Sequence, residues 1–355
     1  MLVKTFLNIL LLPYNVNEPF QQSKREDGIA SALVTGGTGF IGSHTVESLL
    51  QRGFTVRCLV RATRQGMGWL KDLPVEIVKT DFMDRASLTR AVQNVDTIFH
   101  IAGVTKAKND DEYIRGNVQT TEALLEAACT NRSLQKFCFV GSLTAVGPSP
   151  DGTPLTEDSP CHPITAYGRS KLEAEQLCLS YRDRIPLVVL RPPAVYGPRD
   201  RDVFEIFRGV HLGISPIFGK EEKTLSLIHG ADLARALVGA AIAENTTGQV
   251  YFATDPVVYR YSDLVATLAI VMKKRPIAIR IPPLLLQGLA SVIEGVSYFL
   301  SSPAVLNTDK ARDLLQPHWV CSGKKLQEHT GFTISVPIEE RLRTTYAWYR
   351  QHGWL

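Results

Sequence analysis

Tyr167 and Lys171 stand four residues apart in the sequence. Residues at this spacing project from one face of a helix, so the phenol and the ammonium group would lie together. A phenol titrates at about pH 10 in water, which makes it a poor base at neutral pH. A cation one turn away favours the phenolate and lowers the pKa of the phenol. The pair therefore predicts a side chain that exchanges a proton with a carbinol or carbonyl oxygen.

Three glycines, Gly36, Gly39 and Gly42, follow a short apolar stretch and lead into a segment with helical apolar periodicity. Gly36 permits a tight turn, Gly39 lets the backbone approach a pyrophosphate, and Gly42 lets helix pack against strand. The first turn of such a helix offers unpaired N–H groups to phosphates. The sequence therefore predicts a dinucleotide site. An oxidised nicotinamide there would add to Lys171 in favouring the Tyr167 phenolate, and Lys171 would also bond ribose hydroxyls.

Ser142 follows an apolar stretch that is predicted to be a strand. Its hydroxyl is therefore expected at the C-terminal edge of the sheet, where ligands of such folds bind. From there it would polarise the same substrate oxygen that Tyr167 serves. Thr144, two residues on, is the alternative donor.

The second predicted strand ends with Val60 and Arg61, about 20 residues past the glycines. An enzyme that uses NAD usually places an acidic residue there to hold the adenosine ribose, and Val60 cannot do this. Arg61 would instead grip a 2′-phosphate as a charge-assisted donor, with Arg57 and Arg64 nearby. We therefore expect NADP(H) as the preferred cofactor, with NAD as the alternative.

The stretches around these motifs alternate between strand and helix patterns. Such alternation is typical of a parallel sheet covered on both faces, with its ligand crevice at the C-terminal strand ends. The prediction is an α/β fold, a doubly wound parallel sheet of the Rossmann type with a smaller C-terminal α+β domain. The predicted strands are Ser31–Thr35, Thr55–Val60, Val75–Lys79, Thr97–Ile101, Lys136–Val140 and Leu187–Leu190, and the predicted helices are Ile41–Arg52, Ser87–Val92, Glu112–Cys129 and Ala166–Tyr181.

Composition shifts after Arg191, where proline and glycine cluster. We expect residues 28–190 to form the nucleotide-binding domain and residues 191–355 to form mainly the substrate-binding domain. Segments near 224–253 are expected to return to the main sheet, with strand, helix and strand predicted over Thr224–Ile228, Ala231–Ala243 and Gln249–Ala253.

The bulk composition excludes several classes of protein. Apolar residues make up 45% of the 355 and charged residues 21%, which is ordinary for a globular protein, and a net charge of +4 without a compact basic run gives no case for nucleic-acid binding. Six cysteines without C-x-x-C spacing indicate free thiols in a reducing compartment, so the cytoplasm is the expected location. The histidines show no metal-ligand spacing, so we predict no metal, and His100 is expected to be a packed or hydrogen-bonded core residue.

Two apolar segments are harder to assign. Residues 1–27 have an apolar start too short to span a bilayer and no cleavage site, so a flexible extension is predicted. Residues 282–302 fit either an interfacial helix that contacts a membrane or a core-facing amphipathic helix. The core-facing interpretation is favoured because the polar face of this segment lacks Lys and Arg.

The combination of motifs resembles the extended short-chain dehydrogenase/reductase family, which includes epimerases, dehydratases and 3β-hydroxysteroid dehydrogenases. The matching residues are the run 35–42, Asp81, 100–103, Asn117, Ser142, Tyr167, Lys171 and the run 191–198. By this resemblance Phe40 and Ile41 join the glycines in the cofactor site, Asp81 and Phe82 border the adenine, Ala102 and Gly103 line the cofactor, and Pro192 and Pro193 flank the nicotinamide. Homodimers are frequent in this family.

Departures from the family patterns narrow the expected reaction. Family dehydratases carry an Asp-Glu pair directly after the hydroxyl residue, whereas Leu143 and Thr144 follow Ser142 here. Sugar-nucleotide epimerases commonly have an Asn that reaches the substrate diphosphate where this chain has Ala194, which leaves an apolar wall. The substrate pocket is expected to draw on Thr105, Lys106, Leu143, Thr144, Ala194 and Tyr196.

The leading hypothesis is an NADP(H)-dependent oxidoreductase that interconverts a secondary alcohol and a ketone on a hydrophobic molecule, such as a steroid, terpenoid or flavonoid. Ser142 and Tyr167 would bind the oxygen, Tyr167 would carry the proton, and Lys171 would tune it. A sugar-nucleotide epimerase of the same family is the alternative. A non-catalytic NADP-binding sensor is a third hypothesis, disfavoured because relatives of that type typically lose the tyrosine and lysine.

Overall fold

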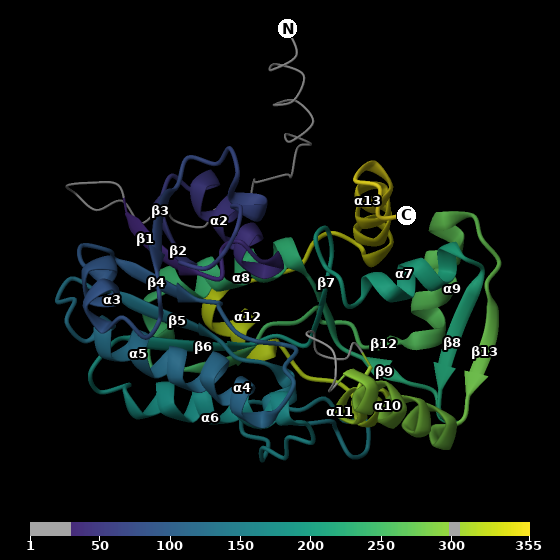
Figure 1. The fold of residues 1–355 in the computed structure, drawn as a ribbon. Coiled ribbons are helices and arrows are strands. Elements are labelled where there is room, and N and C mark those ends of the chain that lie inside the picture. The colour runs from purple at the N-terminus through teal and green to yellow at the C-terminus, as the bar shows by residue number, and fades with distance from the viewer. Residues whose placement is uncertain (1–29, 298–305) are drawn as a thin grey trace, which may run out of the picture.

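The computed structural model describes residues 30–297 and 306–355 (Figure 1), so the expected extension at 1–27 and the end of segment 282–302 lie outside the described residues. A seven-stranded parallel sheet dominates the first half of the chain, in the order β11-β6-β5-β4-β1-β2-β3. Its strands are β1 (Ser31–Thr35), β2 (Thr55–Arg61), β3 (Glu76–Thr80), β4 (Thr97–His100), β5 (Lys136–Val140), β6 (Leu187–Arg191) and β11 (Val250–Phe252). The predicted α/β class is confirmed.

Helices cover both faces of this sheet, which explains why its strands are almost continuously apolar. Alternate residues of a strand point to opposite faces, and in β1 Val34 packs into one core cluster while Leu33 packs into the other. The first cluster lies under α2 (Phe40–Gln51), α8 (Gly230–Ile242) and α12 (Lys324–Thr330). The second lies under α3 (Arg85–Val92), α5 (Thr120–Ala128) and α6 (Ala166–Ser180).

The strand order reverses between β1 and β4. In parallel sheets of this kind the connections diverge at such a point and leave a crevice outside the C-terminal strand ends. The glycine run leaves β1 there, and Ala102 and Gly103 follow β4 to the same edge. The topology therefore brings the predicted cofactor residues together.

Two predicted elements are divided in the structure. The predicted strand Thr224–Ile228 is two strands in different sheets, β9 (Thr224–Leu225) and β10 (Leu227–His229). Between them the Ser226 hydroxyl bonds the backbone of Cys321, accepting from its N–H at 3.0 Å. The predicted helix Glu112–Cys129 is divided into α4 (Asp110–Tyr113), a π-helical turn at Ile114–Gln119, and α5.

The remaining segments of the second half of the chain form small sheets and helices, many of which pack around a third core cluster. Their strands are β7 (Ala194–Tyr196) paired with β10, β8 (Ile214–Phe218) with β13 (Ile277–Ile281), and β9 with both β12 (Tyr259–Arg260) and β14 (His318–Trp319). Their helices are α7 (Phe204–His211), α9 (Tyr261–Met272), α10 (Pro283–Ser297), α11 (Thr308–Leu315) and α13 (Ile338–Gln351). Short 3₁₀ turns occur at Gly68–Leu70, Leu143–Ala145 and Glu244–Thr246.

Helix α10 differs from the expectation of a core-facing helix. Only Leu286 and Ala290 of its described side chains are buried, whereas Leu284 is 84% exposed. Among the helices described, none is both long and apolar enough to cross a bilayer.

Candidate active site

Helix α6 places Tyr167 and Lys171 at the C-terminal edge of the sheet. Thr165 caps the helix by accepting a hydrogen bond from the N–H of Gly168 at 3.0 Å, which fixes where the helix begins. Lys171 is buried, its Nζ donates to the carbonyl of Val140 at 2.6 Å, and it lies 4.4 Å from the centre of the Phe139 ring. The ammonium is therefore held at the end of β5, beside the turn that carries the predicted serine.

Ser142 leaves β5 and caps the 3₁₀ turn that follows. Its Oγ accepts the hydroxyl proton of Thr144 at 2.7 Å and the Thr144 N–H at 3.2 Å. The Ser142 hydroxyl also hydrogen-bonds Tyr167. Because the single hydroxyl proton of Thr144 is directed at Ser142, the geometry favours Ser142 over Thr144 as the donor to a substrate oxygen.

Burial shifts the pKa of Tyr167 and the pKa of Lys171 in the directions that favour the uncharged form of each side chain. Desolvation raises the pKa of Tyr167 to about 12, while the Ser142 hydrogen bond acts in the opposite direction. Desolvation also lowers the pKa of Lys171 to about 8. The expected lowering of the Tyr167 pKa by Lys171 is thus wrong for the chain alone, because loss of water outweighs any effect of the cation. Tyr167 is protonated at neutral pH and is ready to give a proton.

The glycine run has the shape that a pyrophosphate requires. Gly36 has φ of +75°, and a Cβ on it would lie 2.7 Å from the backbone nitrogen of Ala102. A Cβ on Gly42 would overlap the carbonyl of Gly36. Helix α2 begins at Phe40 with Gly39 as its cap, and no described side chain satisfies its first N–H groups. This uncapped, acid-free terminus fits the phosphates of a dinucleotide.

A chain of buried hydrogen bonds joins β1 to the helix that follows β4. The Thr35 hydroxyl accepts the N–H groups of Ile101 and Ala102, each at 3.1 Å, and contacts His100 Nδ1 at 2.8 Å. His100 Nε2 contacts the hydroxyl of Thr121 at 2.8 Å, and Thr121 donates to the carbonyl of Asn117. The His100 ring is fully buried, which lowers its pKa to about 3. The prediction of a hydrogen-bonded core histidine is confirmed.

Asn117 ties the loop after β4 to the catalytic helix. Its Oδ1 accepts the N–H of Val104 at 2.7 Å, and its Nδ2 donates to the Val104 carbonyl and to the Ser170 hydroxyl at 2.9 Å. Ser170 in turn donates to the carbonyl of Tyr167 at 2.8 Å. Asn117 lies in the π-helical turn, a local widening of a helix that is frequent at functional sites.

A buried ion pair connects helix α6 to the end of strand β6. The Arg191 guanidinium, at the end of β6, donates to both carboxylate oxygens of Glu175 at 2.5 to 3.1 Å, and both side chains are buried. Glu175 lies one further turn along α6 from Lys171. Sequence reasoning missed this pair, although the regular spacing of Tyr167, Lys171 and Glu175 on one helix face was a usable signal.

The three predicted arginines differ in their surroundings. Arg57 is bound away from the cleft, to Glu76 at 2.8 Å and to the carbonyls of Ala91 and Gln93, so it does not join the cofactor site. Arg61 ends β2 and is exposed. Arg64 and Thr38 converge on Gly68: the Cβ position of that glycine lies 3.3 Å from Arg64 Nη2 and 3.1 Å from the Thr38 carbonyl.

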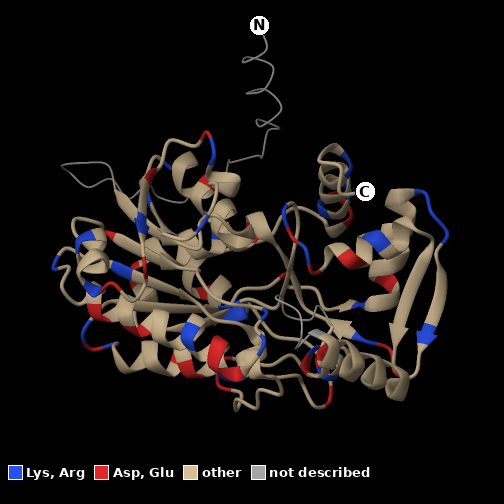
Figure 2. Ribbon diagram, in the orientation of Figure 1, with Lys and Arg blue, Asp and Glu red and all other residues tan. Residues whose placement is uncertain are grey.

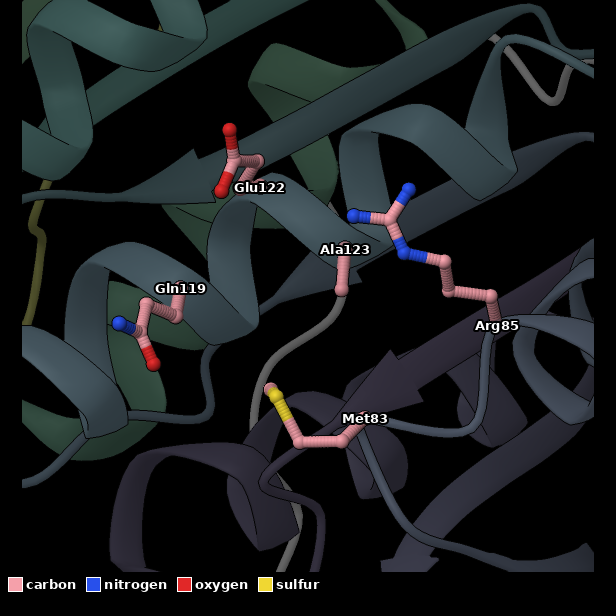
Figure 3. A pocket seen from close by; sticks show the side chains of 5 residues that line it. All are labelled: Met83, Arg85, Gln119, Glu122 and Ala123. Atoms are coloured by element: carbon pink, nitrogen blue, oxygen red, sulfur yellow. The ribbon is translucent and has the colours of Figure 1, made fainter.

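Asp81 and Phe82 lie at the end of β3, where the adenine is expected. Asp81 is exposed and accepts the N–H of Met83 at 2.9 Å, and Phe82 is buried. A pocket of about 220 Å³ begins at the next residue and lies between the start of α3 and α5 (Figure 3). It is lined by Met83, Arg85, Gln119, Glu122 and Ala123, and none of the predicted catalytic residues contributes to it.

The predicted substrate residues divide into two groups. Thr105 and Ala194 are exposed, and Thr144 is half-buried. Leu143 and Tyr196 are instead core residues: Leu143 packs with Phe252, and Tyr196 packs edge-on against His229.

The two prolines expected beside the nicotinamide are buried, and the carbonyl of Pro192 accepts the N–H of Leu143 at 2.9 Å. A contact from the far end of the chain adds to the site: the Asp309 carboxylate accepts the N–H of Ala166 at 2.6 Å. No local pattern signals Asp309, because it lies 143 residues from its partner.

Comparisons with known proteins identify the family of this chain. Residues 32–252 match the model of the NAD dependent epimerase/dehydratase family. The chain is 28% identical over 342 residues to a ceramide reductase of Caulobacter vibrioides, covering 93% of this chain and 97% of that protein. It is 24% identical to 3beta-hydroxysteroid-dehydrogenase/decarboxylase isoform 2 of Arabidopsis thaliana, covering 88% of this chain and 61% of that protein.

Solved structures share the fold. A UDP-glucuronic acid 4-epimerase from Bacillus cereus, in complex with UDP-glucuronic acid and NAD, superposes with a TM-score of 0.73 at 22% identity, covering 91% of this chain and 99% of that one. The chain belongs to the NAD-dependent epimerase/dehydratase family, within the extended short-chain dehydrogenases/reductases, and is an NAD-dependent oxidoreductase or epimerase.

Proposed function

We propose that this protein is an NADP(H)-dependent reductase that converts a ketone on a lipophilic molecule to a secondary alcohol, and reverses the reaction when the cofactor is oxidised. The observation that carries the proposal is the pairing of Ser142 with Tyr167, whose pKa burial raises to about 12. A phenol that is protonated at neutral pH is suited to give its proton to an oxygen that is gaining negative charge.

The residues divide the work of such a reaction. The bound cofactor would supply the hydride. Backbone N–H groups at the start of α2 would hold its pyrophosphate, and Lys171 would bond its ribose while staying cationic beside the phenol. The Ser142 hydroxyl and Tyr167 would both donate to the substrate carbonyl oxygen, and Tyr167 would pass its proton to that oxygen as the alcohol forms.

Two observations support a lipophilic substrate. The exposed residue at position 194 is alanine, which offers a methyl group where family epimerases commonly have an amide for the substrate diphosphate. Relatives that align along most of the chain are named for a ceramide and for a 3β-hydroxysteroid. Both names denote lipids with a hydroxyl group or ketone on a hydrocarbon frame.

Arg61 and Arg64 support NADP(H) as the cofactor. They are linked by a turn in which the N–H of Arg64 donates to the carbonyl of Arg61 at 2.9 Å. Arg64 Nε is shielded from solvent and has no hydrogen-bond partner among the described residues. A guanidinium beside the glycine run at Thr38 is suited to a 2′-phosphate.

The cofactor assignment is tested by measuring Kd for NADPH and NADH in Arg64→Ala and in the matched control Arg57→Ala. Loss of one charge-assisted contact is worth about 1.5–3 kcal/mol, so Arg64→Ala should weaken NADPH roughly 10- to 100-fold and leave NADH unchanged. Arg57→Ala should leave the NADPH-to-NADH preference unaltered. Equal loss of both cofactors in Arg64→Ala would contradict the assignment.

The reaction is tested with a panel of ketosteroids, N-acyl ketosphingoid lipids, flavanonols and UDP-sugars. Steady consumption of NADPH with a lipophilic ketone is the expected result. Conversion of a UDP-sugar to its epimer without net consumption of cofactor would favour the epimerase alternative instead.

A further inference from the structure

One face of α10 is hydrocarbon and faces solvent. Its exposed apolar side chains are Leu284, Leu285, Leu289, Val292 and Val296, with exposed fractions between 51% and 84%. At 100° per residue they occupy an arc of about 140° on one side of the helix. On the opposite side, Leu286 and Ala290 pack against Ala311 of α11. The helix is thus seated on the protein by a narrow strip only.

Strand β13 continues this apolar surface. Ile277 and Ile279 are 72% and 45% exposed, and Ile277 pairs with the exposed Ile214 of β8. The strand leads directly into α10 at the corner of the molecule farthest from β3 (Figure 1). A group of large apolar side chains exposed on neighbouring elements indicates an interaction site, whereas single exposed apolar residues are ordinary.

Four exposed cations lie on β13 and in the turn before it. Lys273, Lys274 and Arg275 are exposed in the turn between α9 and β13, and Arg280 is exposed on β13 itself. Figure 2 shows the blue band on β13 near the end that leads into the largely uncharged α10, and the blue turn before β13 at the opposite end of that strand. In the sequence, residues 273–293 hold these four cations and no carboxylate. The cations of this surface thus lie on β13 and in the turn before it, and not on α10 itself.

We propose that β13, α10 and the turn 273–275 form a docking surface for an anionic lipid bilayer. An apolar helix face with a cationic border is the pattern of an interfacial helix. Fifteen residues of helix measure about 22 Å, less than the roughly 30 Å of a hydrocarbon core, so α10 would lie in the interface. A second copy of the chain is the alternative occupant, and the sedimentation measurement below distinguishes it.

Two hydrogen bonds connect the docking surface, through α11, to the start of helix α6. Glu294 of α10 accepts the N–H of Thr308, the first residue of α11, at 3.0 Å. The next residue, Asp309, accepts the N–H of Ala166 at 2.6 Å, immediately before Tyr167. If the substrate is the lipophilic ketone of the proposed function, this arrangement brings the cleft beside the lipid that contains it. Docking itself does not depend on that reaction.

The test is flotation of the purified full chain with vesicles of phosphatidylcholine mixed with phosphatidylglycerol, compared with phosphatidylcholine alone. Wild type is expected to float with the anionic vesicles, and less so at high salt. The variant Leu284→Glu with Leu289→Glu should bind at least tenfold more weakly, since it places two charges on the lipid-facing side. The control Met83→Glu, at a side chain 54% exposed in the first half, should bind like wild type.

A second variant isolates the charge contribution. Lys274→Gln with Arg275→Gln leaves Lys273 in its left-handed cap position, and should weaken binding to anionic vesicles roughly 30-fold, at about 1 kcal/mol per cation. Undiminished flotation of both double variants would overturn the proposal. So would sedimentation showing that wild type is a dimer which the α10 variant dissociates. Because flotation needs neither cofactor nor ketone, its outcome is independent of the ketone panel.

Discussion

The half of the molecule that carries the seven-stranded sheet and the half that follows it differ in how their strands are covered. Every residue of β4, β5 and β6 is buried, and these three strands end at the loops that carry the candidate site. In β13, four of five residues are exposed. The proposed chemistry therefore depends on a buried core that tolerates little change, whereas the proposed contact with a membrane is made by an exposed surface.

The largest expected effect is on catalysis in the first half. Tyr167→Phe removes the proton donor and should lower kcat for ketone reduction about 10²- to 10⁴-fold, while NADPH affinity stays within a few-fold. Tyr251→Phe is the matched control, because its hydroxyl is also hydrogen-bonded, to His329 at 2.8 Å, but lies outside the cleft. Its kcat should be that of wild type. Retained activity in Tyr167→Phe would remove Tyr167 from the reaction.

The buried Glu175–Arg191 pair tests how much an ion pair in the sheet half contributes to the free energy of unfolding. Glu175→Gln leaves a buried guanidinium without its counterion and should lower the free energy of unfolding by about 3–5 kcal/mol. In the second half, Glu339→Gln breaks an exposed pair with Arg343 and should cost less than about 1 kcal/mol. Denaturant titration of the two variants measures both. Equal losses would contradict the difference between the halves.

Acid should destabilise the sheet half through His100. Burial lowers its pKa to about 3, below the usual 6.5, so the folded state keeps the ring neutral while the unfolded chain takes up a proton. Stability from this group is therefore present above about pH 6.5 and is lost as the pH falls toward 3, on the order of a few kcal/mol in total. His100→Asn should show a shallower loss of Tm between these pH values. An unchanged slope would remove His100 as the cause.

The smallest effect is expected on α10. Leu289→Ala, at a side chain 51% exposed, should change the free energy of unfolding by no more than about 0.5 kcal/mol. Leu286→Ala, on the buried strip of the same helix, should cost about 2 kcal/mol or more. If Leu289→Ala proved as costly as Leu286→Ala, its side chain would be packed in solution and not available to lipid.

The strands of the main sheet and the local motifs could be predicted from the sequence, because each of these features depends on residues that are close together in the chain. The glycine run and the Tyr167–Lys171 spacing carry their own geometry, and strand periodicity located the sheet. The pKa of Tyr167 was not predictable in the same way. Its shift depends on how much water the assembled cleft excludes, and the spacing to Lys171 holds no information on that.

The features that the sequence did not predict depend mostly on contacts between segments that are far apart in the chain. Asp309 reaches Ala166, and Ser226 divides a predicted strand by bonding Cys321, without any local signal. The exposed face of α10 was also misjudged, because apolar periodicity shows that a helix has an apolar face and not what covers it.

The central claim is that burial keeps Tyr167 protonated so that it gives its proton to a carbonyl oxygen. The most direct test is the pH dependence of kcat/KM for NADPH-dependent reduction of a ketone found with the panel. The account predicts a constant value through neutral pH and a fall above about pH 8, where Lys171, whose pKa burial lowers to about 8, loses its charge. A value that rises with pH through neutrality, as a phenolate base would produce, would contradict it.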